Sequence, residues 1–265
     1  MRSLLVPLLL LTLFIDPALA QTPGALVAVG GGGTTERIVQ RTLELAGGKD
    51  AVIVVLPQSS ALENAGDSSV RMWQEAGAKS VRKVGFADPD AKAALETATL
   101  IWIPGGDQNR FMKAIAGTGL DAVIRARHQA GAVVGGTSAG AAVLSGLMIT
   151  GKADLQSLDS GTTVLAQGLG LWTVGIFDQH FLRRQRNNRL LSVVLDHPDT
   201  IGVGIDEATA VIVRGGTLEV IGRSAVVVFD ARRANVTKGT ASSGLGATGI
   251  VTSVLREGMT LTVDR

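Results

Sequence analysis

The chain has 265 residues, with 25 basic and 23 acidic side chains, a net charge of +2 and no cysteine. A balance this close to neutral argues against general affinity for nucleic acid, and the 3% of aromatic residues argue against stacking platforms for bases or glycans. Without cysteine, disulfides and thiolate zinc sites are excluded, so stability has to come from packing.

The first twenty residues have the pattern of a secretory signal peptide. Arg2 supplies a short positive start, the stretch from Leu4 to Ile15 is apolar, and Ala18-Leu19-Ala20 forms a small-residue cleavage site. The apolar stretch is too short to span a bilayer. We therefore expect residues 1–20 to be a cleaved signal peptide and residues 21–265 to form a single α/β domain with a β-rich C-terminal part. The mature protein is expected in the periplasm or outside the cell, without a membrane anchor.

Short apolar runs alternate with helical segments in the first half of the chain. The expected strands span residues 25–29, 51–56, 79–84, 100–103 and 132–134. The expected helices are one that ends at Leu45 after a Thr34 or Thr35 cap, then 70–76, 91–98 and 111–130. This alternation predicts parallel βαβ units with functional loops at the carboxyl ends of the strands. After about Ile201 the pattern changes to hairpins that complete the sheet, at 202–213, 218–220, 226–229 and 249–263.

A candidate nucleophile follows the fifth of these strands. Gly136-Thr137-Ser138-Ala139-Gly140 fits G-x-S-x-G, the sharp strand-to-helix turn that raises a serine above a parallel sheet. The Ala139 amide and the turn at Gly106 are the expected donors to an oxyanion, aided by the helix behind the serine. The same pattern fits an ordinary glycine-rich βα loop, so the catalytic interpretation depends on finding a base.

Only one of the three histidines is placed to serve as that base. His128 lies in a polar stretch and is expected on a solvated helix face, and His197 is expected in a turn that ends a helix. His180 follows a short apolar strand, 172–177, at a strand end where catalytic loops belong in this architecture. His180 is therefore the candidate base.

The acid that orients the histidine has several candidates. Glu207 lies between two apolar strands and is preferred, with Asp206 and Asp178 as rivals. Asp154, Asp159 or Asp178 would give the Ser-acid-His order of an α/β-hydrolase esterase, and order alone does not decide between these arrangements.

Two further segments bear on the ligand. Gly30 to Gly33 lack the spacing of a dinucleotide motif and the lysine of a P-loop, so we expect them to let backbone approach the active site. Arg183, Arg184, Arg186 and Arg189 crowd behind the candidate base. A solvated helix face is the ordinary explanation for such a run, but arginine forks also suit carboxylates. Beside a catalytic base, the run favours an acidic substrate.

Four segments together resemble the serine peptidase family that contains cyanophycinase and aspartyl dipeptidase. They are Pro104-Gly105-Gly106-Asp107-Gln108, Gly136-Thr137-Ser138-Ala139-Gly140-Ala141, Asp178-Gln179-His180-Phe181 with the trailing Arg184, Arg186 and Arg189, and Gly204-Ile205-Asp206-Glu207. The segments keep the family's order, and the resemblance runs from about Ala25 to Phe229. It implies a class I glutamine amidotransferase-like (flavodoxin-like) fold, an α/β three-layer sandwich with a mostly parallel central sheet.

The resemblance also implies a serine exopeptidase with Ser138 as nucleophile, His180 as base and Glu207 as orienting acid. The positions that match the family's substrate pocket are Gln108, Gln179, Arg184 and Arg186, with Asp178 where an acidic pocket residue is expected. The implied substrate is cyanophycin, a poly-aspartate with arginine linked to each side-chain carboxyl. It is cut to β-Asp-Arg dipeptides by attack at a β-aspartyl-type peptide bond, without metal or cofactor.

Other activities also fit these features. Gly30 to Gly33 replace the family's usual Gly-Gly-acidic turn, and the expected signal peptide favours a substrate met outside the cell. A secreted aspartyl or isoaspartyl dipeptidase of the same family is the first alternative, and a catalytically inactive binder of acidic peptides is the second. No nucleic-acid or membrane partner is expected. A homodimer is compatible with the sequence, which leaves the oligomeric state open.

Overall fold

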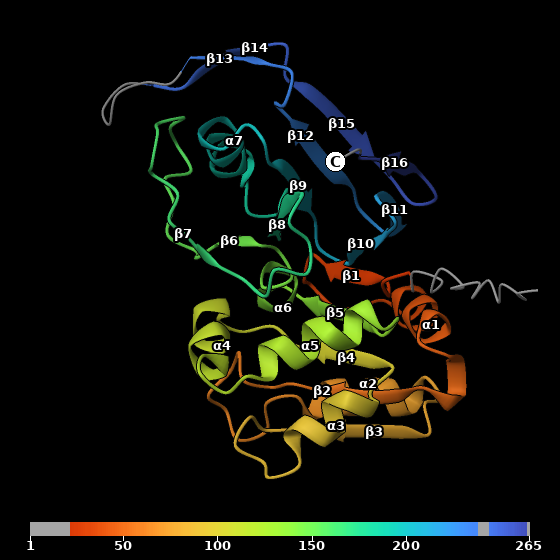
Figure 1. Ribbon diagram of the computed structural model, residues 1–265. Helices are drawn as coiled ribbons and strands as arrows, with labels where there is room; N and C mark the ends of the chain where they lie inside the picture. The colour runs from red at the N-terminus through yellow and green to blue at the C-terminus, as the bar shows by residue number, and fades with distance from the viewer. Residues whose placement is uncertain (1–21, 238–243, 264–265) are drawn as a thin grey trace, which may run out of the picture.

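The computed structural model describes residues 22–237 and 244–263, and the expected signal peptide lies outside them. An eight-stranded sheet forms its centre (Figure 1). Its strands are β1 (Leu26–Val29), β2 (Val52–Val55), β3 (Ser80–Lys83), β4 (Leu100–Ile103), β5 (Val133–Thr137), β10 (Thr209–Arg214), β11 (Thr217–Gly222) and β16 (Thr260–Thr262). The first five are parallel in the order β1-β5-β4-β2-β3, and β10, β11 and β16 continue past β1 as antiparallel strands.

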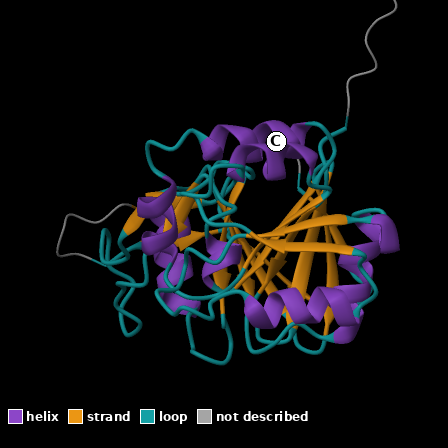
Figure 2. Cartoon of the chain, turned by 90° about the horizontal axis from the view of Figure 1, so that it is seen from below, coloured by secondary structure: helices purple, strands orange, loops and turns teal. Residues whose placement is uncertain are grey.

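Helices cover both faces of this sheet, so the molecule has three layers (Figure 2). They are α1 (Glu36–Leu45), the 3-10 turn η1 (Gly48–Asp50), α2 (Asp67–Glu75), α3 (Ala91–Thr97), α4 (Gln108–Ile115), α5 (Leu120–Gln129) and α6 (Ala139–Ala142). Val27 and Val29 of β1 pack in a core with α1 and α2, whereas Leu26 and Ala28 pack in a second core with α3, α4 and α5. Successive side chains of this strand thus point to opposite faces of the sheet, and each face is covered by helices. The predicted three-layer α/β sandwich with a mostly parallel sheet is confirmed.

A second, four-stranded sheet lies beside the first and carries the histidine and glutamate of the candidate site. Its strands are β8 (Gly175–Gln179), β9 (Ile201–Ile205), β12 (Val226–Asp230) and β15 (Val251–Leu255), in the order β8-β9-β12-β15, and α7 (Asn187–Asp196) packs on it. Two further hairpins are β6 (Leu147–Ile149) with β7 (Leu165–Gln167), and β13 (Asn235–Thr237) with β14 (Gly246–Thr248).

The prediction that all C-terminal hairpins complete one sheet is therefore wrong in part. β12 is buried on both faces, because Val226 and Val228 enter the core shared with the main sheet while Val227 and Phe229 pack with residues of α7. In sequence, an apolar strand that extends the main sheet looks the same as an apolar strand of a separate sheet. In the structure, α7 packs on the outer face of the second sheet and so makes it a separate unit.

Three of the differences between predicted and observed elements matter for the fold or the site. The helix expected over 111–130 is two helices, separated where Gly117 and Gly119 have left-handed φ angles of 76° and 75°. The hairpin expected over 202–213 does not form: β9 and β10 are separated by the turn that contains Glu207 and belong to different sheets. The strand expected over 172–177 begins at Gly175 and ends at Gln179.

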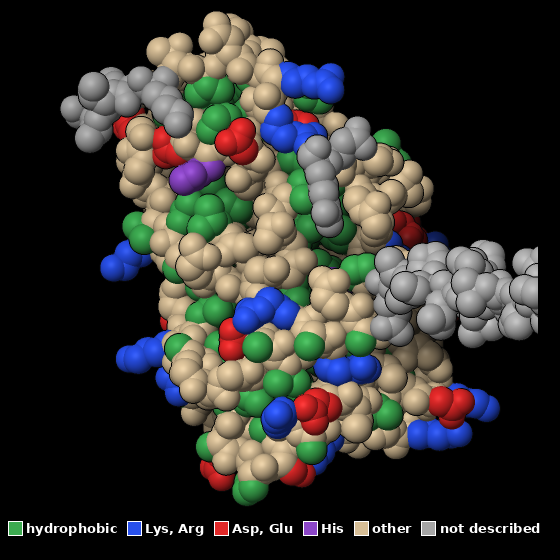
Figure 3. Space-filling view, in the orientation of Figure 1, with side chains coloured by type: hydrophobic (Ala, Val, Ile, Leu, Met, Phe, Trp, Pro, Cys, Tyr) green, Lys and Arg blue, Asp and Glu red, His purple; other side chains and the backbone are tan. Residues whose placement is uncertain are grey.

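The visible surface shows no large block of one charge. In Figure 3 basic and acidic side chains are interspersed over the face seen, consistent with a net charge of +2. Within the described residues, no helix is long and apolar enough to cross a membrane.

Candidate active site

Ser138 stands on the sharp turn between β5 and α6. Its backbone angles are φ 54° and ψ −112°, a combination that residues other than glycine rarely adopt and that indicates backbone strain. The flanking glycines permit the turn: a Cβ on Gly136 would come within 2.6 Å of the Gly140 backbone, and one on Gly140 would collide with the Ile103 carbonyl. The G-x-S-x-G pattern thus has the expected strand-turn-helix context.

Ser138, His180 and Glu207 form a continuous hydrogen-bonded chain. Ser138 Oγ lies 2.9 Å from His180 Nε2, and His180 Nδ1 lies 2.7 Å from Glu207 Oε1. Since a carboxylate only accepts, Nδ1 carries the proton and Nε2 is free to accept from the serine. β8 and β9 run parallel with Gln179 opposite Ile205, so the residues after them meet at one edge. The structure brings the three predicted residues together.

The two rival acids are engaged elsewhere. Asp206 accepts hydrogen bonds from the Ser224 hydroxyl at 2.6 Å and the Arg183 amide at 2.9 Å. Burial opposes ionisation of Asp206, but these donors hold its pKa below the ordinary value. Asp178 is fully buried, and both of its oxygens accept from the guanidinium of Arg189. Neither acid hydrogen-bonds to His180, which leaves Glu207 in that place.

The glycine loop after β1 packs directly against this chain. A Cβ on Gly31 would collide with the His180 ring, and one on Gly32 would lie 2.5 Å from the Glu207 Cβ. The Gly30 carbonyl accepts from the His180 amide at 2.7 Å, and the Gly31 carbonyl accepts from the amide that follows Glu207 at 2.8 Å. These glycines let the backbone approach the active site, as predicted, and they hold the base and acid in place.

The expected oxyanion donors lie at the turns around the serine. Ala139 opens α6, so its amide belongs to the first turn, where a helix has no internal acceptors. α6 has only four residues, so the dipole that the sequence predicts behind the serine is short. Gly106 lies in the turn after β4, where a Cβ on Gly105 would come within 3.4 Å of Ser138 Cβ. The role of the Gly106 and Ala139 amides stays a prediction.

The predicted substrate residues fall into two groups. Arg184 is exposed, and Arg186 is largely buried with Nη1 donating to the Gln179 carbonyl at 2.6 Å. Burial lowers the pKa of Arg186 to about 10, so its guanidinium stays charged at neutral pH. Gln179 is buried, and its Oε1 has no hydrogen-bond partner among the described residues. Gln108 is also buried, with Nε2 donating to the Ile149 carbonyl at 2.7 Å.

The prediction that Asp178 contacts substrate is not supported by its surroundings. The side chain has no exposed surface, and Arg189 occupies both carboxylate oxygens. Arg186 Nη1 lies 3.6 Å from one of those oxygens. Asp178 therefore offsets one of the two positive charges of Arg189 and Arg186, and a net positive charge remains next to the site.

The other two histidines have different outcomes. His128 is only 4% exposed, so the prediction of a solvated helix face is wrong; it lies on the side of α5 that is turned to the protein. His197 is exposed and caps the C-terminus of α7, as predicted.

Replacing Asp178 with asparagine should destabilise the fold rather than abolish chemistry directly. It leaves Arg189 and Arg186 buried without a counter-charge, which costs about 3–5 kcal/mol when one partner of a buried pair is removed. Urea unfolding measures the loss. Asp121→Asn is the control, because it breaks a partly exposed pair with Arg125 and should cost no more than about 1 kcal/mol. Equal stabilities of the two variants would contradict this role.

The surroundings of His180 lower its pKa. Burial lowers the pKa of His180, the hydrogen bond to Glu207 opposes that effect, and the positive charges of Arg184 and Arg186 lower it further. The imidazole is therefore neutral at pH 7 and can accept a proton. The acid limb of a pH profile should lie below the ordinary imidazole pKa.

Replacing Arg184 with glutamine should move that limb to higher pH. The substitution removes a positive charge that lowers the pKa of His180, so the pKa rises and the neutral form is lost at a higher pH. The profile of kcat/KM against pH measures the shift. Arg183→Gln is the control: it removes an exposed neighbouring charge that does not contribute to the lowering. An unmoved limb in the Arg184 variant, or a shift to lower pH, would contradict the assignment.

Comparison with known proteins adds family information. The model of peptidase family S51 matches residues 26–221. Cyanophycinase from Geminocystis herdmanii is 38% identical over 211 residues, which cover 76% of this chain and 78% of the relative. Cyanophycinase from Thermosynechococcus vestitus is 37% identical over 228 residues, 81% of this chain and 70% of the relative.

Solved structures are similar in fold. The crystal structure of a peptidase from an acI-B1 Actinobacterium aligns with a TM-score of 0.66 at 20% identity, covering 92% of this chain and 98% of that one. A putative peptidase E protein from Listeria monocytogenes EGD-e aligns with a TM-score of 0.57 at 16% identity, covering 76% and 100%. These neighbours confirm the class I glutamine amidotransferase-like fold. The family match and the level of identity to curated relatives together establish that the chain belongs to peptidase family S51 and is a serine-type peptidase.

Proposed function

We propose that this peptidase hydrolyses cyanophycin to β-Asp-Arg dipeptides through a Ser138–His180–Glu207 triad. The observation that carries the proposal is the hydrogen-bonded chain from Ser138 Oγ through both nitrogens of His180 to Glu207, with Arg184 and Arg186 close behind the histidine. The similarity to curated cyanophycinases supports the choice of polymer.

The bond that is broken follows from the product. A β-Asp-Arg dipeptide keeps the β-aspartyl amide between the aspartate side chain and arginine. The scissile bond is therefore the α-peptide bond that joins successive aspartates, which replaces the expectation of attack at a β-aspartyl-type bond. Each arginine of the polymer retains a free carboxylate. Arg184 and Arg186 supply guanidinium groups suited to such carboxylates.

The reaction has two stages. His180 Nε2 takes the proton of Ser138 as Oγ attacks the carbonyl carbon, and the amides of Ala139 and Gly106 hold the oxyanion. His180 then gives the proton to the leaving nitrogen, which departs and leaves an acyl-enzyme. A water that loses its proton to His180 attacks the ester and restores Ser138. Glu207 stabilises the imidazolium in both stages.

Incubation with purified cyanophycin tests the substrate. The expected result is release of β-Asp-Arg, identified by mass, with no free arginine. Aspartyl and isoaspartyl dipeptides are assayed side by side, because turnover of these and not of the polymer would transfer the function to a dipeptidase. Free arginine as the product would overturn the assignment of the scissile bond.

The place of action is a further part of the proposal. The pattern of residues 1–20 supports export, so the peptidase would meet polymer or peptides outside the cytoplasm. Expression of the full chain in a bacterial host and N-terminal sequencing of the exported protein test this. A mature chain that begins near Gln21 is expected, and a cytoplasmic protein with an intact N-terminus would contradict it.

A further inference from the structure

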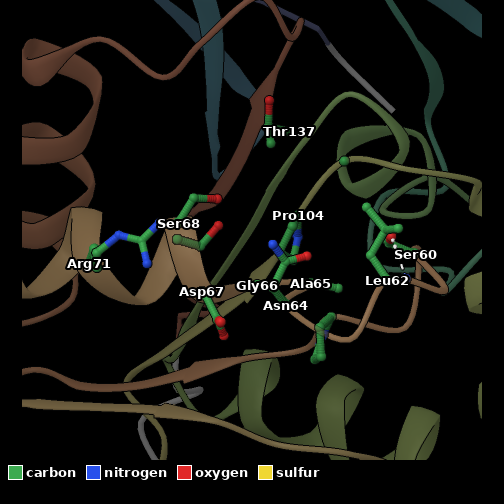
Figure 4. Close-up of a pocket in the computed structure, with 13 residues that line it drawn as sticks. Ser60, Leu62, Asn64, Ala65, Gly66, Asp67, Ser68, Arg71, Pro104 and Thr137 are labelled. Atoms are coloured by element: carbon green, nitrogen blue, oxygen red, sulfur yellow. Dashed lines mark hydrogen bonds between the residues drawn. The ribbon is translucent and has the colours of Figure 1, made fainter.

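A pocket adjoins the nucleophile on the side away from His180. His180 and Glu207 pack on the loop after β1, and the order β1-β5-β4-β2 places the strand ends of β4 and β2 on the other side of Ser138. A pocket of about 360 Å³ lies there, between the loop after β2, the start of α2 and the turn after β4 (Figure 4). The lining residues used below are Ser60, Asn64, Ser68, Arg71, Gly105 and Thr137.

The pocket wall is attached to the turn that touches the nucleophile. Ser59 Oγ lies 2.9 Å from the carbonyls of both Pro104 and Gly105, and the Asp107 amide donates to the Ser59 carbonyl at 2.7 Å. Thr137 immediately precedes Ser138, and Gly105 packs beside it. The loop after β2 therefore has a fixed position relative to Ser138, as a substrate subsite requires.

Arg71 gives this pocket a positive charge that no acidic side chain of the described residues pairs with. Arg71 is exposed and has no ion-pair partner among the described residues, whereas the neighbouring Asp67 pairs with Lys83. Figure 4 shows the Arg71 side chain directed toward Ser68 at the start of α2. Hydroxyl and amide groups of Ser60, Asn64 and Ser68 add hydrogen-bond donors. One guanidinium with several neutral donors fits a carboxylate.

We propose that this pocket is a second substrate subsite, in which Arg71 binds a carboxylate on the substrate residue across the scissile bond from the one held by Arg184 and Arg186. The inference rests on the proposed function. A peptide bond has a residue on each side, and every unit of the proposed polymer bears a carboxylate. Positive groups on both sides of Ser138 then hold two successive units, which sets the bond between them over the serine.

The test compares Arg71→Gln with the wild type on a trimer of β-Asp-Arg units and on the same trimer with its arginine carboxylates amidated. On the acid trimer, KM should rise about tenfold with kcat within about twofold, since a contact made equally in the ground and transition states changes KM alone. On the amidated trimer, Arg71→Gln and the wild type should have the same KM and the same kcat. Arg214→Gln is the matched control, because it removes an exposed charge at the other end of the strands, where Val213 pairs with Leu26 at the start of β1. This variant should match the wild type on both substrates.

Each outcome decides between the two proposals. Equal KM for Arg71→Gln and the wild type, or the same loss on both trimers, overturns the subsite while the function stands. If the wild type does not cleave the acid trimer, the proposed function fails. The subsite is then judged by calorimetric titration of the trimer into Ser138→Ala and Ser138→Ala/Arg71→Gln proteins. Weaker binding by the double variant supports the subsite, and equal or absent binding overturns it.

Discussion

Replacing Ser138 with alanine should lower kcat about 10⁶-fold, because no nucleophile remains to form the acyl-enzyme. The fold should be unaffected. The Ser138 side chain makes one hydrogen bond, to His180, among the described residues, and alanine meets the same backbone angles that serine already adopts. Release of β-Asp-Arg over time measures the rate, and thermal unfolding measures the fold.

Ser192→Ala is the matched control for this variant. Its Oγ is buried without a partner among the described residues, so removal of that hydroxyl breaks no hydrogen bond and should leave kcat unchanged. Turnover by Ser138→Ala at a rate near the wild type would remove Ser138 from the mechanism.

Replacing Glu207 with glutamine should lower kcat about 10⁴-fold at nearly unchanged KM. A glutamine amide can donate to His180 Nδ1, which favours the tautomer with the proton on Nε2. That nitrogen then cannot accept the proton of Ser138. Steady-state kinetics measure the effect, because a loss in kcat at constant KM indicates an interaction made in the transition state.

Asp206→Asn serves as the control for position and charge. Asp206 adjoins Glu207 in the chain but accepts from Ser224 and Arg183 instead of His180. Its kcat loss should be far smaller than that of Glu207→Gln. If instead Asp178→Asn alone abolished activity in folded protein and Glu207→Gln remained active, Asp178 would be the orienting acid.

The grouping of Ser138, His180 and Glu207 was predictable because each of the three follows an apolar strand. Strand ends in parallel sheets meet at one edge, so Ser138, His180 and Glu207 could be placed together without knowing any distance. Choice among the three acids required the structure. Nothing local in sequence distinguishes Glu207 from Asp206, and the pairing of Asp178 with Arg189 joins β8 to α7 across eleven positions.

The sequence predicted that the glycine loop approaches the active site, but not which residues it touches. Gly31 packs on the ring of His180 and Gly32 on the side chain of Glu207, and these contacts depend on how β1, β8 and β9 are placed. Arg71 lies on the exposed face of a helix, where a basic residue gives no sign of function in the sequence. Only the structure shows that Arg71 and the loop after β2 line the same pocket. The rule that functional loops follow parallel strands did point to that loop, because it begins where β2 ends.

Labelling with a fluorophosphonate probe tests the central claim most directly, because the probe reacts only with an activated serine and the labelled residue can be identified by peptide mass. The account predicts one label, on Ser138, that is lost in His180→Ala and slowed by excess β-Asp-Arg trimer. Label on another serine, or no label on folded protein, would contradict a Ser138–His180–Glu207 peptidase.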